Sequence, residues 1–575
     1  MLGREFIKQL TVGGFQVFAD PVTIPLGPLT LLYGPNSAGK SAILDAMLAL
    51  ADLCELQVSS NESAGSKHHR IGSILGPHWR RESTRPTELA KELKLGAVIR
   101  LAGTEWAEAG FAFSRFGFGQ LEPREGCESC FPVLKSLLTP EHLDVEVSIQ
   151  YRLSEEGKVP IANQALAQEQ RITVRLNGSL ILYFDEPAGL AGINLDHPSL
   201  LGWDVAADLK WMAQRCEGGF VTLDGWFGTG LSVLHGGRLS TNAVDGIESM
   251  LAAEEQHRAR SAETSFINMF DALFRSSLKS MSSTLRVPLV PASRAVPSRS
   301  DVTFLLTTDA TLLTGEPIGL QVKGLPDHLE ITRSAFVSEM ARYENKMTPE
   351  GAFGERLNRP SKVPVDLVNR LLADYLFSSS GYFVSAGIHE LTSLSSNAND
   401  EMWPKAMGAA RKFLVSLELG DSTGRRFNFD EVGSGLGYVL PVLLAVATSR
   451  TCFLQQPELH LHPALQSQLA DALIVALGDA DFGGHNARGC HQIIAETHSE
   501  HLLLRLLRRI RQAADPDRSL DPHSLGRESV VVLYVDPNPD GMSTVKHLRI
   551  SREGEFIDRW SHGFFEERWT ELFDE

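Results

Sequence analysis

The chain has 575 residues, a formal net charge of −17 and 43% hydrophobic residues. At roughly 150 residues per domain, this length predicts two to four folding units, and the apolar content predicts a folded chain. Because the overall charge is negative, nucleic acid would have to be bound by local basic patches. The apolar stretch from Val439 to Ala447 contains Pro441 and is far shorter than the roughly 20 residues that span a bilayer. We therefore expect no membrane span and, without an apolar signal segment in residues 1–10, a cytoplasmic protein.

Upstream of the first motif, Ile7 to Leu26 alternates apolar and polar residues around Gly13-Gly14, which predicts a pair of strands. The motif itself, at 34–41, reads Gly-Pro-Asn-Ser-Ala-Gly-Lys-Ser. It follows the apolar run Leu29 to Tyr33 and opens a stretch with helical periodicity, Ala42 to Leu50, as a Walker A motif requires. The flanking strand and helix signals disfavour the alternative, a glycine-rich turn that only precedes a helix.

A Walker A loop binds a nucleoside triphosphate because its backbone N–H groups and the following helix N-terminus point at the phosphates. In this chain the residues expected to bind the nucleotide are Asn36, Ser37, Ala38, Gly39, Lys40 and Ser41. Lys40 would reach the β and γ phosphates, and the Ser41 hydroxyl would hold Mg²⁺.

Alternating segments return after the first predicted helix, at 97–101, 145–151, 172–176 and 180–184. The last two are joined by Asn177-Gly178, a dipeptide typical of tight hairpins. We expect a mostly antiparallel β subdomain within an N-terminal part that spans 1–195.

The pattern changes to helical periodicity in the segments 247–279, 329–346 and 363–377. These predict a mainly helical insertion at 196–405, and a further helix is expected over 406–419. None of these segments carries sustained heptads with charged flanks, so no long coiled-coil arm is expected. The third part, 406–575, contains the second group of motifs.

That group begins with a glycine-rich segment, FNFDEVGSGLG at 427–437, which leads into a predicted helix over 438–448. A predicted strand over 451–454 then ends in QQPELHLHP at 455–463. Another predicted strand over 492–495 ends in ETHS at 496–499.

Taken in this order, the motifs resemble the ABC-type ATPase heads of the SMC, RecF and OLD-like group, an AAA-type family, and the resemblance covers both ends of the chain. The closing stretch from Gly554 to Phe565 is similar to small OLD-like ATPases of bacterial defence, including Septu-type and retron-associated systems. The resemblance implies an α/β fold: an ABC-type P-loop ATPase head with an antiparallel β subdomain and a helical insertion. It also implies ATP and Mg²⁺ as cofactors and a homodimer or higher homo-oligomer.

By position, Gly433, Ser434 and Gly435 match the signature of this family, whose N–H groups and hydroxyl bind the γ-phosphate held by the opposite subunit. His498 matches the switch histidine, which contacts the γ-phosphate and senses its loss. The residues alone also allow simpler roles, with Ser434 as a helix N-cap and His498 as a core histidine with satisfied hydrogen bonds.

The chain departs from the family where the Walker B strand ends. Most relatives carry an acid that holds the magnesium shell and then a glutamate that activates water, whereas Gln455 and Gln456 occupy these positions here. An amide can accept a hydrogen bond from metal-bound water, but it takes no proton and adds no negative charge. We expect Gln455 beside the metal, Gln456 and His498 at the hydrolysis step, and slow turnover. Glu458 is the nearest remaining carboxylate and would take the place of the missing acid if the turn folds back. Glutamine at the Walker B positions occurs in natural variants and in engineered traps for the ATP-bound dimer.

Other features are less specific. Six cysteines are scattered over the chain, which favours reduced thiols, and the isolated Cys127 to Cys130 pair lacks the further ligands of a zinc site. Arg294, in the segment PASRAVPSR at 291–299, resembles an element of relatives, in which guanidinium groups reach phosphate or fix the insertion against the head; we favour the structural role. Two basic clusters are solvated surfaces or nucleic-acid contacts: Lys67, His68, His69 and Arg70 with Arg80, Arg81 and Arg85, and the helix face with Arg505, Arg508, Arg509 and Arg511.

Three functions follow from these features. The first is a sensor in anti-phage defence, dimeric around ATP, that controls a separately encoded effector such as a nuclease. A built-in nuclease is disfavoured, because Asp536 and Asp540 lie in a Pro-Asn-Pro turn without the pattern of a metal-binding Toprim domain. The alternatives are a DNA-binding repair or maintenance ATPase of the RecF/SMC type, which leaves nucleic acid open as a partner, and a nucleotide-bound scaffold with little turnover.

Overall fold

The structure is a computed structural model of the chain. It describes residues 6–58, 64–76, 78, 81–82, 85–89, 92–101, 142–153, 168–185, 190–194, 197, 270, 273–294, 296–308, 313–317, 328–347, 364–378, 380–391, 411–478, 490–515, 525–539 and 541–560. The chain divides into two compact units: Met1–Gly27, Gly34–Arg286 and Tyr534–His547 form the first, and Pro28–Tyr33, Val287–Leu533 and Leu548–Glu575 the second. The boundaries expected at 195 and 405 lie outside the described residues.

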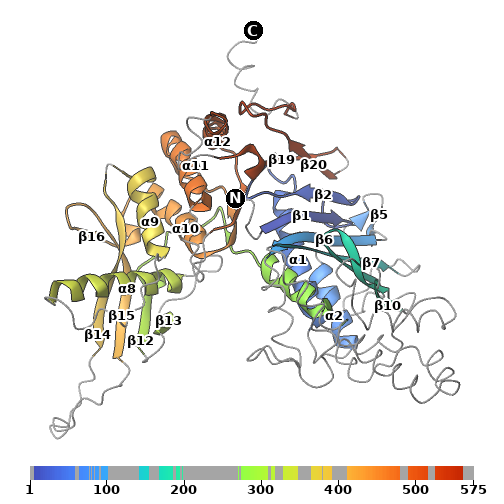
Figure 1. Ribbon diagram of the computed structural model, residues 1–575, viewed down its shortest axis with the longest axis horizontal. Coiled ribbons are helices and arrows are strands. Elements are labelled where there is room, and N and C mark those ends of the chain that lie inside the picture. Colours follow the sequence, from blue (N-terminus) through green and yellow to red (C-terminus); the bar gives the residue numbers. More distant parts are fainter. Residues whose placement is uncertain are drawn as a thin grey trace, which may run out of the picture. The chain divides into compact units, whose positions relative to one another are not determined.

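The first unit contains a seven-stranded antiparallel sheet. Its strands are β1 (Phe6–Gly13), β2 (Val22–Pro25), β6 (Glu92–Leu101), β7 (Leu143–Leu153), β8 (Gln168–Leu176), β9 (Ser179–Asp185) and β10 (Leu190–Ile193). Their order is β10-β9-β8-β7-β6-β1-β2 (Figure 1). Alternate residues are buried, as at Ala97 opposite Val147 and Ile99 opposite Val145. The predicted antiparallel subdomain is therefore confirmed, and its period-two pattern arises because one face of the sheet packs into the core.

The turn between β8 and β9 is the hairpin that the sequence predicted. Both residues of the turn have positive φ, 50° at Asn177 and 82° at Gly178, and Leu176 pairs with Ser179 across it. Two positive φ values define a type I′ turn, whose twist matches that of the strands. A Cβ atom on Gly178 would meet nothing within 4 Å, so the backbone conformation, rather than space, is what favours glycine there.

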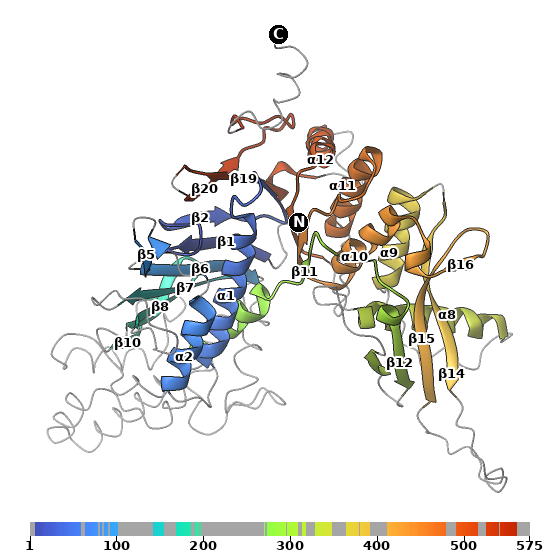
Figure 2. The ribbon, with the colours of Figure 1, turned by 180° about the vertical axis from the view of Figure 1, so that it is seen from behind.

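Helix α1 (Lys40–Val58) packs against β1 and β6 in the first unit (Figure 2). A helix over 273–285 is tied to α1 by ion pairs, with Lys279 Nζ 2.5 Å from Glu55 Oε1 and Arg286 2.8 Å from Asp52. The helix expected over 247–279 is thus confirmed only in its last part, because 247–269 lie outside the described residues.

The second unit contains four neighbouring parallel strands in the order β11-β17-β18-β3. They are β11 (Leu289–Val290), β17 (Thr451–Gln455), β18 (Gln492–Glu496) and β3 (Leu29–Tyr33). The sheet continues to β19 (Val530–Pro537) and β20 (Ser543–Leu548), where the chain passes into the first unit. All of β3 is buried, as are the first four residues of β17 and of β18, which explains their unbroken apolar runs.

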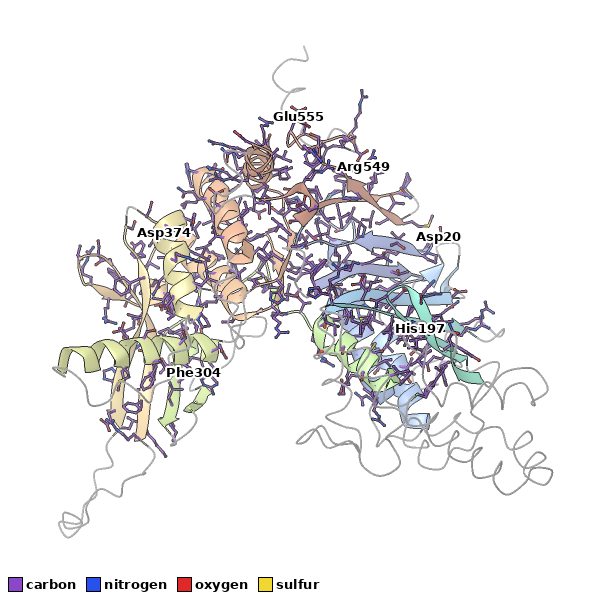
Figure 3. All side chains as sticks on the ribbon, viewed as in Figure 1. Asp20, His197, Phe304, Asp374, Arg549 and Glu555 are labelled. Atoms are coloured by element: carbon purple, nitrogen blue, oxygen red, sulfur yellow. The ribbon has the colours of Figure 1, made fainter. Side chains whose placement is uncertain are left out.

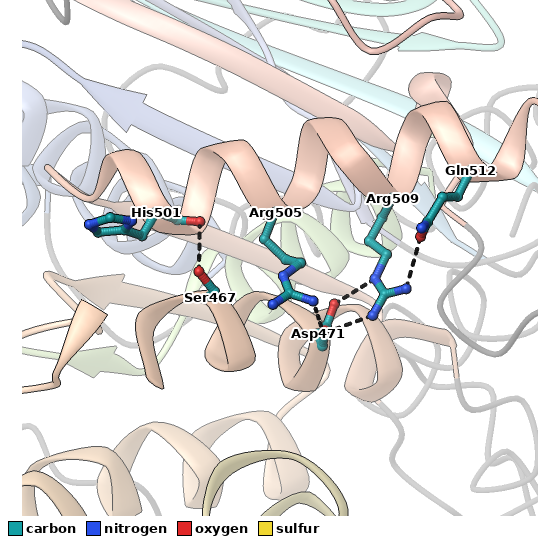
Figure 4. A network of polar contacts seen from close by, with 6 residues as sticks. All are labelled: Ser467, Asp471, His501, Arg505, Arg509 and Gln512. Atoms are coloured by element: carbon teal, nitrogen blue, oxygen red, sulfur yellow. Dashed lines mark hydrogen bonds and ion pairs between the residues drawn. The ribbon is translucent and has the colours of Figure 1, made fainter. Parts of the chain in front are cut away.

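Helices α10 (Ser434–Thr448), α11 (Pro463–Gly478) and α12 (Glu500–Ala513) follow the predicted motifs. The guanidinium groups of Arg505 and Arg509 on α12 both pair with the buried Asp471 of α11, at 3.2 and 2.8 Å (Figure 4). Arg511 donates to the carbonyl of Glu553 at 2.7 Å. Three of the four arginines of this expected basic face therefore stabilise the unit itself, which favours the interpretation as an ordinary helix surface.

A second antiparallel sheet in this unit has the order β13-β12-β15-β14, with helix α8 lying across it (Figure 1). Its strands are β12 (Thr303–Thr308), β13 (Leu313–Pro317), β14 (Phe383–Leu391) and β15 (Arg411–Gly420). Phe304 on β12, labelled in Figure 3, is buried. Helices α8 (His328–Met347) and α9 (Pro364–Leu371), which a π-helical turn extends to Leu376, confirm the two helices predicted in this region.

The predicted helix over 406–419 is wrong. Residues 411–420 form strand β15, which pairs with β12 on one side and β14 on the other. Phe413, Val415, Leu417 and Leu419 are buried at every second position. Leucines at mixed spacing in this segment satisfy both periods locally, and pairing with distant strands decides between them.

Among the described residues the longest helix is α8, with 20 residues, so the expectation of no long coiled coil holds for this part of the chain. The helices that the structure describes are too short or too polar to cross a membrane.

Candidate functional site

The loop 34–41 follows β3 directly and has the curled backbone that its glycines allow. Gly34, Ser37 and Gly39 have positive φ, at 138°, 63° and 99°. A Cβ atom on Gly39 would lie 2.3 Å from a Val17 methyl group, and one on Gly34 would lie 2.4 Å from the Val535 carbonyl oxygen. Only glycine fits these two positions, so the curl of the loop depends on Gly34 and Gly39.

Lys40 begins α1 with its ammonium group turned back onto the loop. The Nζ atom donates to the carbonyls of Gly34 at 3.0 Å and Pro35 at 2.9 Å, and the side chain is only 3% exposed. Asn36, Ser37 and Ser41 are exposed, whereas Ala38 is buried and Gly39 half-buried. The cationic group is therefore held inside the curl, where an anion on the exposed N–H groups would meet it.

The carboxyl ends of β17, β18 and β3 lie side by side in the second unit. Glu496 is in register with Gln455 on one side and with Leu32 on the other. Because parallel strands place their carboxyl ends at one edge, the loops that follow them all begin at this edge. The loop 34–41 begins two residues after Leu32.

The two Walker B glutamines are the expected metal and hydrolysis positions. The Gln455 amide oxygen accepts a hydrogen bond from the Ala292 N–H at 3.4 Å. Gln456 has a φ of 44° and donates its backbone N–H to the Glu496 carbonyl at 2.7 Å. The chain therefore turns sharply out of β17 and bonds to the end of β18.

Glu458 does fold back, but toward the loop that carries His498. Its Oε1 atom accepts from the His498 N–H at 2.9 Å, and the side chain is 8% exposed. Burial raises the pKa of Glu458, while hydrogen bonds from His498 and Thr497 and the charge of Arg294 act against this rise. The structure thus brings together Gln455, Gln456, Glu458 and His498, with Glu458 joining two loops.

The loop 497–499 is fixed at both ends. The Tyr33 hydroxyl donates to the Ser499 carbonyl at 3.1 Å, and Thr497 donates its N–H to the Leu32 carbonyl at 3.1 Å. The Ser499 hydroxyl caps α12 by accepting from the Leu502 N–H. His498 therefore lies in a well-tied connection between β18 and α12, next to the strand β3 that precedes the loop 34–41.

Arg294 is buried at the exit of β17, with 3% of its surface exposed. Its guanidinium donates to the carbonyls of Tyr438, Pro291, Gln455, Gln456 and Pro457, at 2.7 to 3.2 Å. Burial lowers the pKa of Arg294 to about 10, so the group remains cationic at neutral pH. Sequence analysis expected a structural role, and the observed contacts identify it as a bracket between α10 and the Walker B turn.

The signature residues stand at the N-terminus of α10. Gly433 and Ser434 are exposed and Gly435 is half-buried, whereas all residues from Val439 to Thr448 are buried. The preceding turn is held by a capping box between Asn428 and Glu431. The ring of Tyr438 on the same helix contacts the ring of His460 in the Walker B turn in a tilted arrangement, with centroids 4.3 Å apart. Because Gly433 is the residue at the N-cap, Ser434 does not serve as the cap of α10.

Several expected features lie partly outside the described residues. Cys127, Cys130, Cys216, Arg80 and Asp540 are among them, while Cys54, Cys452 and Cys490 are buried free thiols. Arg81 and Arg85 lie on the short paired strands β4 (Arg81–Glu82) and β5 (Arg85–Leu89). Asp536 is buried and pairs with Lys546 at 2.7 Å.

The closing segment is described as far as Trp560 and packs within the second unit. Arg549, labelled in Figure 3, pairs with Asp558 at 2.7 Å. The ring of Trp560 lies edge-on to Tyr33, with centroids 5.4 Å apart. This segment therefore packs against β3, the strand that leads into the loop 34–41.

Comparison with known proteins agrees with an ATPase domain in this region. Residues 343–505 match the family model described as an AAA domain, putative AbiEii toxin, type IV TA system. This segment contains the signature, the Walker B turn and His498, and the match indicates an AAA-type ATPase domain in this part of the chain.

A short stretch of 43 residues is 49% identical to the chromosome partition protein Smc of Halothermothrix orenii, covering 7% of this chain and 4% of that protein. Among solved structures, the chain is similar to the Smc head domain of Pyrococcus furiosus, with an extended coiled coil and bound to the C-terminal domain of ScpA, at 12% identity and a TM-score of 0.32. That alignment covers 95% of this chain and 97% of the other. The SMC head domain of Thermotoga maritima gives 11% identity and a TM-score of 0.31, covering 95% and 100% of the two chains.

Proposed function

We propose that this chain binds ATP with Mg²⁺ at the loop 34–41 and that two copies close around the nucleotides. The Walker A sequence, the curled backbone and the inward Lys40 support nucleotide binding. The observation that carries the dimer is the start of α10, where Ser434 is exposed at the end of a helix that is buried from Val439 to Thr448. Its hydroxyl and the first N–H groups of α10 are suited to a γ-phosphate brought by a second subunit.

The donor groups fit Mg²⁺ bound with a nucleotide. Mg²⁺ prefers oxygen ligands and is usually held by substrate phosphates, waters and one or two protein groups. Within the described residues, no three His, Cys, Asp or Glu side chains come together as a metal site. The Ser41 hydroxyl of the loop 34–41 offers an oxygen donor, and the motif order assigns the Gln455 amide oxygen to the same metal; bound Mg²⁺ would neutralise charge on the phosphate oxygens.

Slow hydrolysis follows from the amides at the Walker B positions. Gln456 can orient a water molecule but cannot accept its proton, and Glu458 is engaged with the His498 N–H. We expect purified protein to hydrolyse fewer than about one ATP per second, measured as phosphate release with Mg²⁺. In this proposal the ATP-closed dimer is the useful state, and slow hydrolysis sets how long it lasts. A rate of many ATP per second without a partner would contradict it.

The biological role that we propose is a sensor in anti-phage defence that controls a separately encoded effector such as a nuclease. It is supported by the family description, which names a putative toxin of a type IV TA system. An ATP-closed dimer presents a different surface from the open monomer, which lets nucleotide state control a partner.

The alternative is a DNA-binding ATPase of the SMC type, favoured by the short match to Smc. It predicts ATP-dependent DNA binding that weakens with salt and is lost when Arg81 and Arg85 are neutralised. The negative net charge and the internal pairing of Arg505 and Arg509 weigh against it.

Replacing Ser434 with Arg tests the dimer. The long side chain would occupy the space beside the α10 N-terminus, so we expect the dimer dissociation constant in ATP and Mg²⁺ to rise about 100-fold or more. Light scattering after gel filtration measures the mass, and a fluorescent ATP analogue measures affinity in the monomer, which should stay unchanged. The matched control is Ser422→Arg, at an exposed position of the same unit. Equal dimer formation by Ser434→Arg and wild type would refute the proposed arrangement.

A further inference from the structure

Two residues from the strands β19 and β20 contact the loop 34–41 within the first unit. The Val535 carbonyl oxygen of β19 approaches Gly34 so closely that a Cβ atom there would lie 2.4 Å from it. At the start of β20, the Ser543 hydroxyl donates to the Ala38 carbonyl at 2.7 Å, across 505 positions of the chain. These residues all belong to the same unit, and the sequence motifs did not single out Ser543.

Ser543 is held in place from a second side. The residue is only 5% exposed, and its N–H donates to the Val17 carbonyl at 2.9 Å. A methyl group of Val17 in turn lies 2.3 Å from the position that a Cβ atom on Gly39 would take. Ser543 therefore joins the turn between β1 and β2 to the loop 34–41, and its hydroxyl has a fixed position from which to donate.

The bond from Ser543 sets the direction of the next N–H group in the loop. Ala38 and Gly39 share one peptide unit, which is planar and trans like the other described peptide bonds, so its carbonyl and its N–H point in opposite directions. The Ala38 carbonyl is held toward β20, and the Gly39 N–H therefore points away from β20. The Ala38 N–H already donates to the Pro35 carbonyl at 3.3 Å, whereas the Gly39 N–H has no acceptor among the described residues.

This peptide needs a tie because glycine allows it to turn over. Gly39 has a φ of 99°, and glycine adopts negative φ about as readily. Rotation of the 38–39 peptide would exchange the directions of its carbonyl and its N–H. The ammonium group of Lys40 bonds to the carbonyls of Gly34 and Pro35 at the beginning of the loop and leaves the 38–39 peptide to Ser543.

We propose that Ser543 is a positioning residue for the nucleotide, whose hydroxyl keeps the Ala38–Gly39 peptide turned so that the Gly39 N–H faces the phosphates. This inference rests on the proposed binding of ATP at the loop 34–41. The N–H groups of such a loop bind phosphate groups and make no use of the base. The contribution of Ser543 therefore extends to inorganic pyrophosphate, which carries two phosphates and no base.

The first test compares variants that differ by one hydroxyl. Affinity is measured with a fluorescent ATP analogue in Mg²⁺ and by displacement of that analogue with inorganic pyrophosphate. For Ser543→Ala we expect both affinities to fall about tenfold, because a buried carbonyl loses its donor and the peptide is released. Ser543→Thr keeps the hydroxyl and should bind as wild type does, whereas Ser543→Val, which has the same β-branched shape without the hydroxyl, should resemble Ser543→Ala.

The matched control is Ser282→Ala. Ser282 is also buried in the first unit, and its hydroxyl donates to the Glu55 carboxylate at 3.3 Å, fifteen positions beyond Lys40 in the chain. Its removal deletes a buried hydroxyl of the same kind, and we expect wild-type affinity for the analogue and for pyrophosphate.

A spectroscopic measurement separates positioning from general stability. Carbonyl ¹³C in alanine combined with ¹⁵N in glycine selects Ala–Gly peptides in nuclear magnetic resonance, and the Ala38–Gly39 signal is identified by its loss in Ala38→Ser. With saturating pyrophosphate, the Gly39 amide shift should move in wild type and in Ser543→Thr and move much less in Ser543→Ala, because the N–H no longer faces the phosphate.

The possible outcomes distinguish the two proposals. Equal affinities of Ser543→Ala and wild type, equal affinities of Ser543→Thr and Ser543→Val, or the same Gly39 shift in wild type and Ser543→Ala each overturn the role of Ser543, while nucleotide binding by wild type upholds the proposed function. Failure of wild type to bind ATP or pyrophosphate overturns both. If circular dichroism shows that Ser543→Ala does not fold, the comparison of Ser543→Thr with Ser543→Val decides.

Discussion

Replacing Lys40 with Ala is expected to weaken nucleotide binding by about 100-fold, as measured with a fluorescent ATP analogue in Mg²⁺. The ammonium group is held within the loop by the carbonyls of Gly34 and Pro35, where it faces the phosphate position with little freedom to move. Its removal deletes a charge-assisted contact and also releases the two carbonyls that shape the curl.

The matched control for this change is Lys8→Ala. Lys8 belongs to the same unit, and its Nζ atom pairs with Asp144 on the antiparallel sheet at 2.7 Å. We expect Lys8→Ala to bind nucleotide as wild type does. If Lys40→Ala kept wild-type affinity while its circular dichroism matched wild type, the loop 34–41 would not be the nucleotide site.

Local chemistry made the curl of the loop 34–41 and the hairpin at Asn177-Gly178 predictable. Gly34, Gly39 and Gly178 occur where the backbone has positive φ. Because other residues are strained in this conformation, a glycine in the sequence indicates such a position. The buried strands β3, β17 and β18 were also predictable, since each is a short and mainly apolar run.

Features that depend on distant pairing were not predictable in this way. Residues 411–420 carry leucines compatible with a helix, and only pairing with β12 and β14 selects the strand. Glu496 gains its place beside Gln455 through the order of the parallel strands, which brings together positions 41 residues apart in the chain. A motif search interprets each strand end from its own place in the motif order. It does not show which strand ends are neighbours in the sheet.

The role of Arg294 was predicted only in outline. The sequence placed it in a Pro-rich element, while its five carbonyl partners come from three separate stretches of chain. Those partners include Tyr438, which lies in the turn of α10 that contains Pro441, where one intrahelical N–H is missing. The guanidinium thus supports the signature helix at its irregular turn.

Replacing Arg294 with Ala is expected to lower the local stability of β17 and α10 by about 3 kcal/mol or more, because five backbone carbonyls lose a buried cationic donor group. Hydrogen exchange of the amides in β17 and α10 measures this local change. Arg294→Lys keeps the charge but has three donors on a single nitrogen, which cannot span the carbonyls that a planar guanidinium joins, so an intermediate loss is expected.

Arg299→Ala provides the comparison for Arg294→Ala, because Arg299 follows in the same segment and is exposed. In Arg299→Ala, the opening free energies obtained from the exchange rates should stay within about 0.5 kcal/mol of wild type. Since Arg294 bonds both the Tyr438 carbonyl and the Gln456 carbonyl, its loss should raise exchange in α10 and β17 together. Faster exchange in β17 alone would mean that α10 is held by its apolar packing, and the bracket between the signature helix and the Walker B turn would then not exist as an energetic unit.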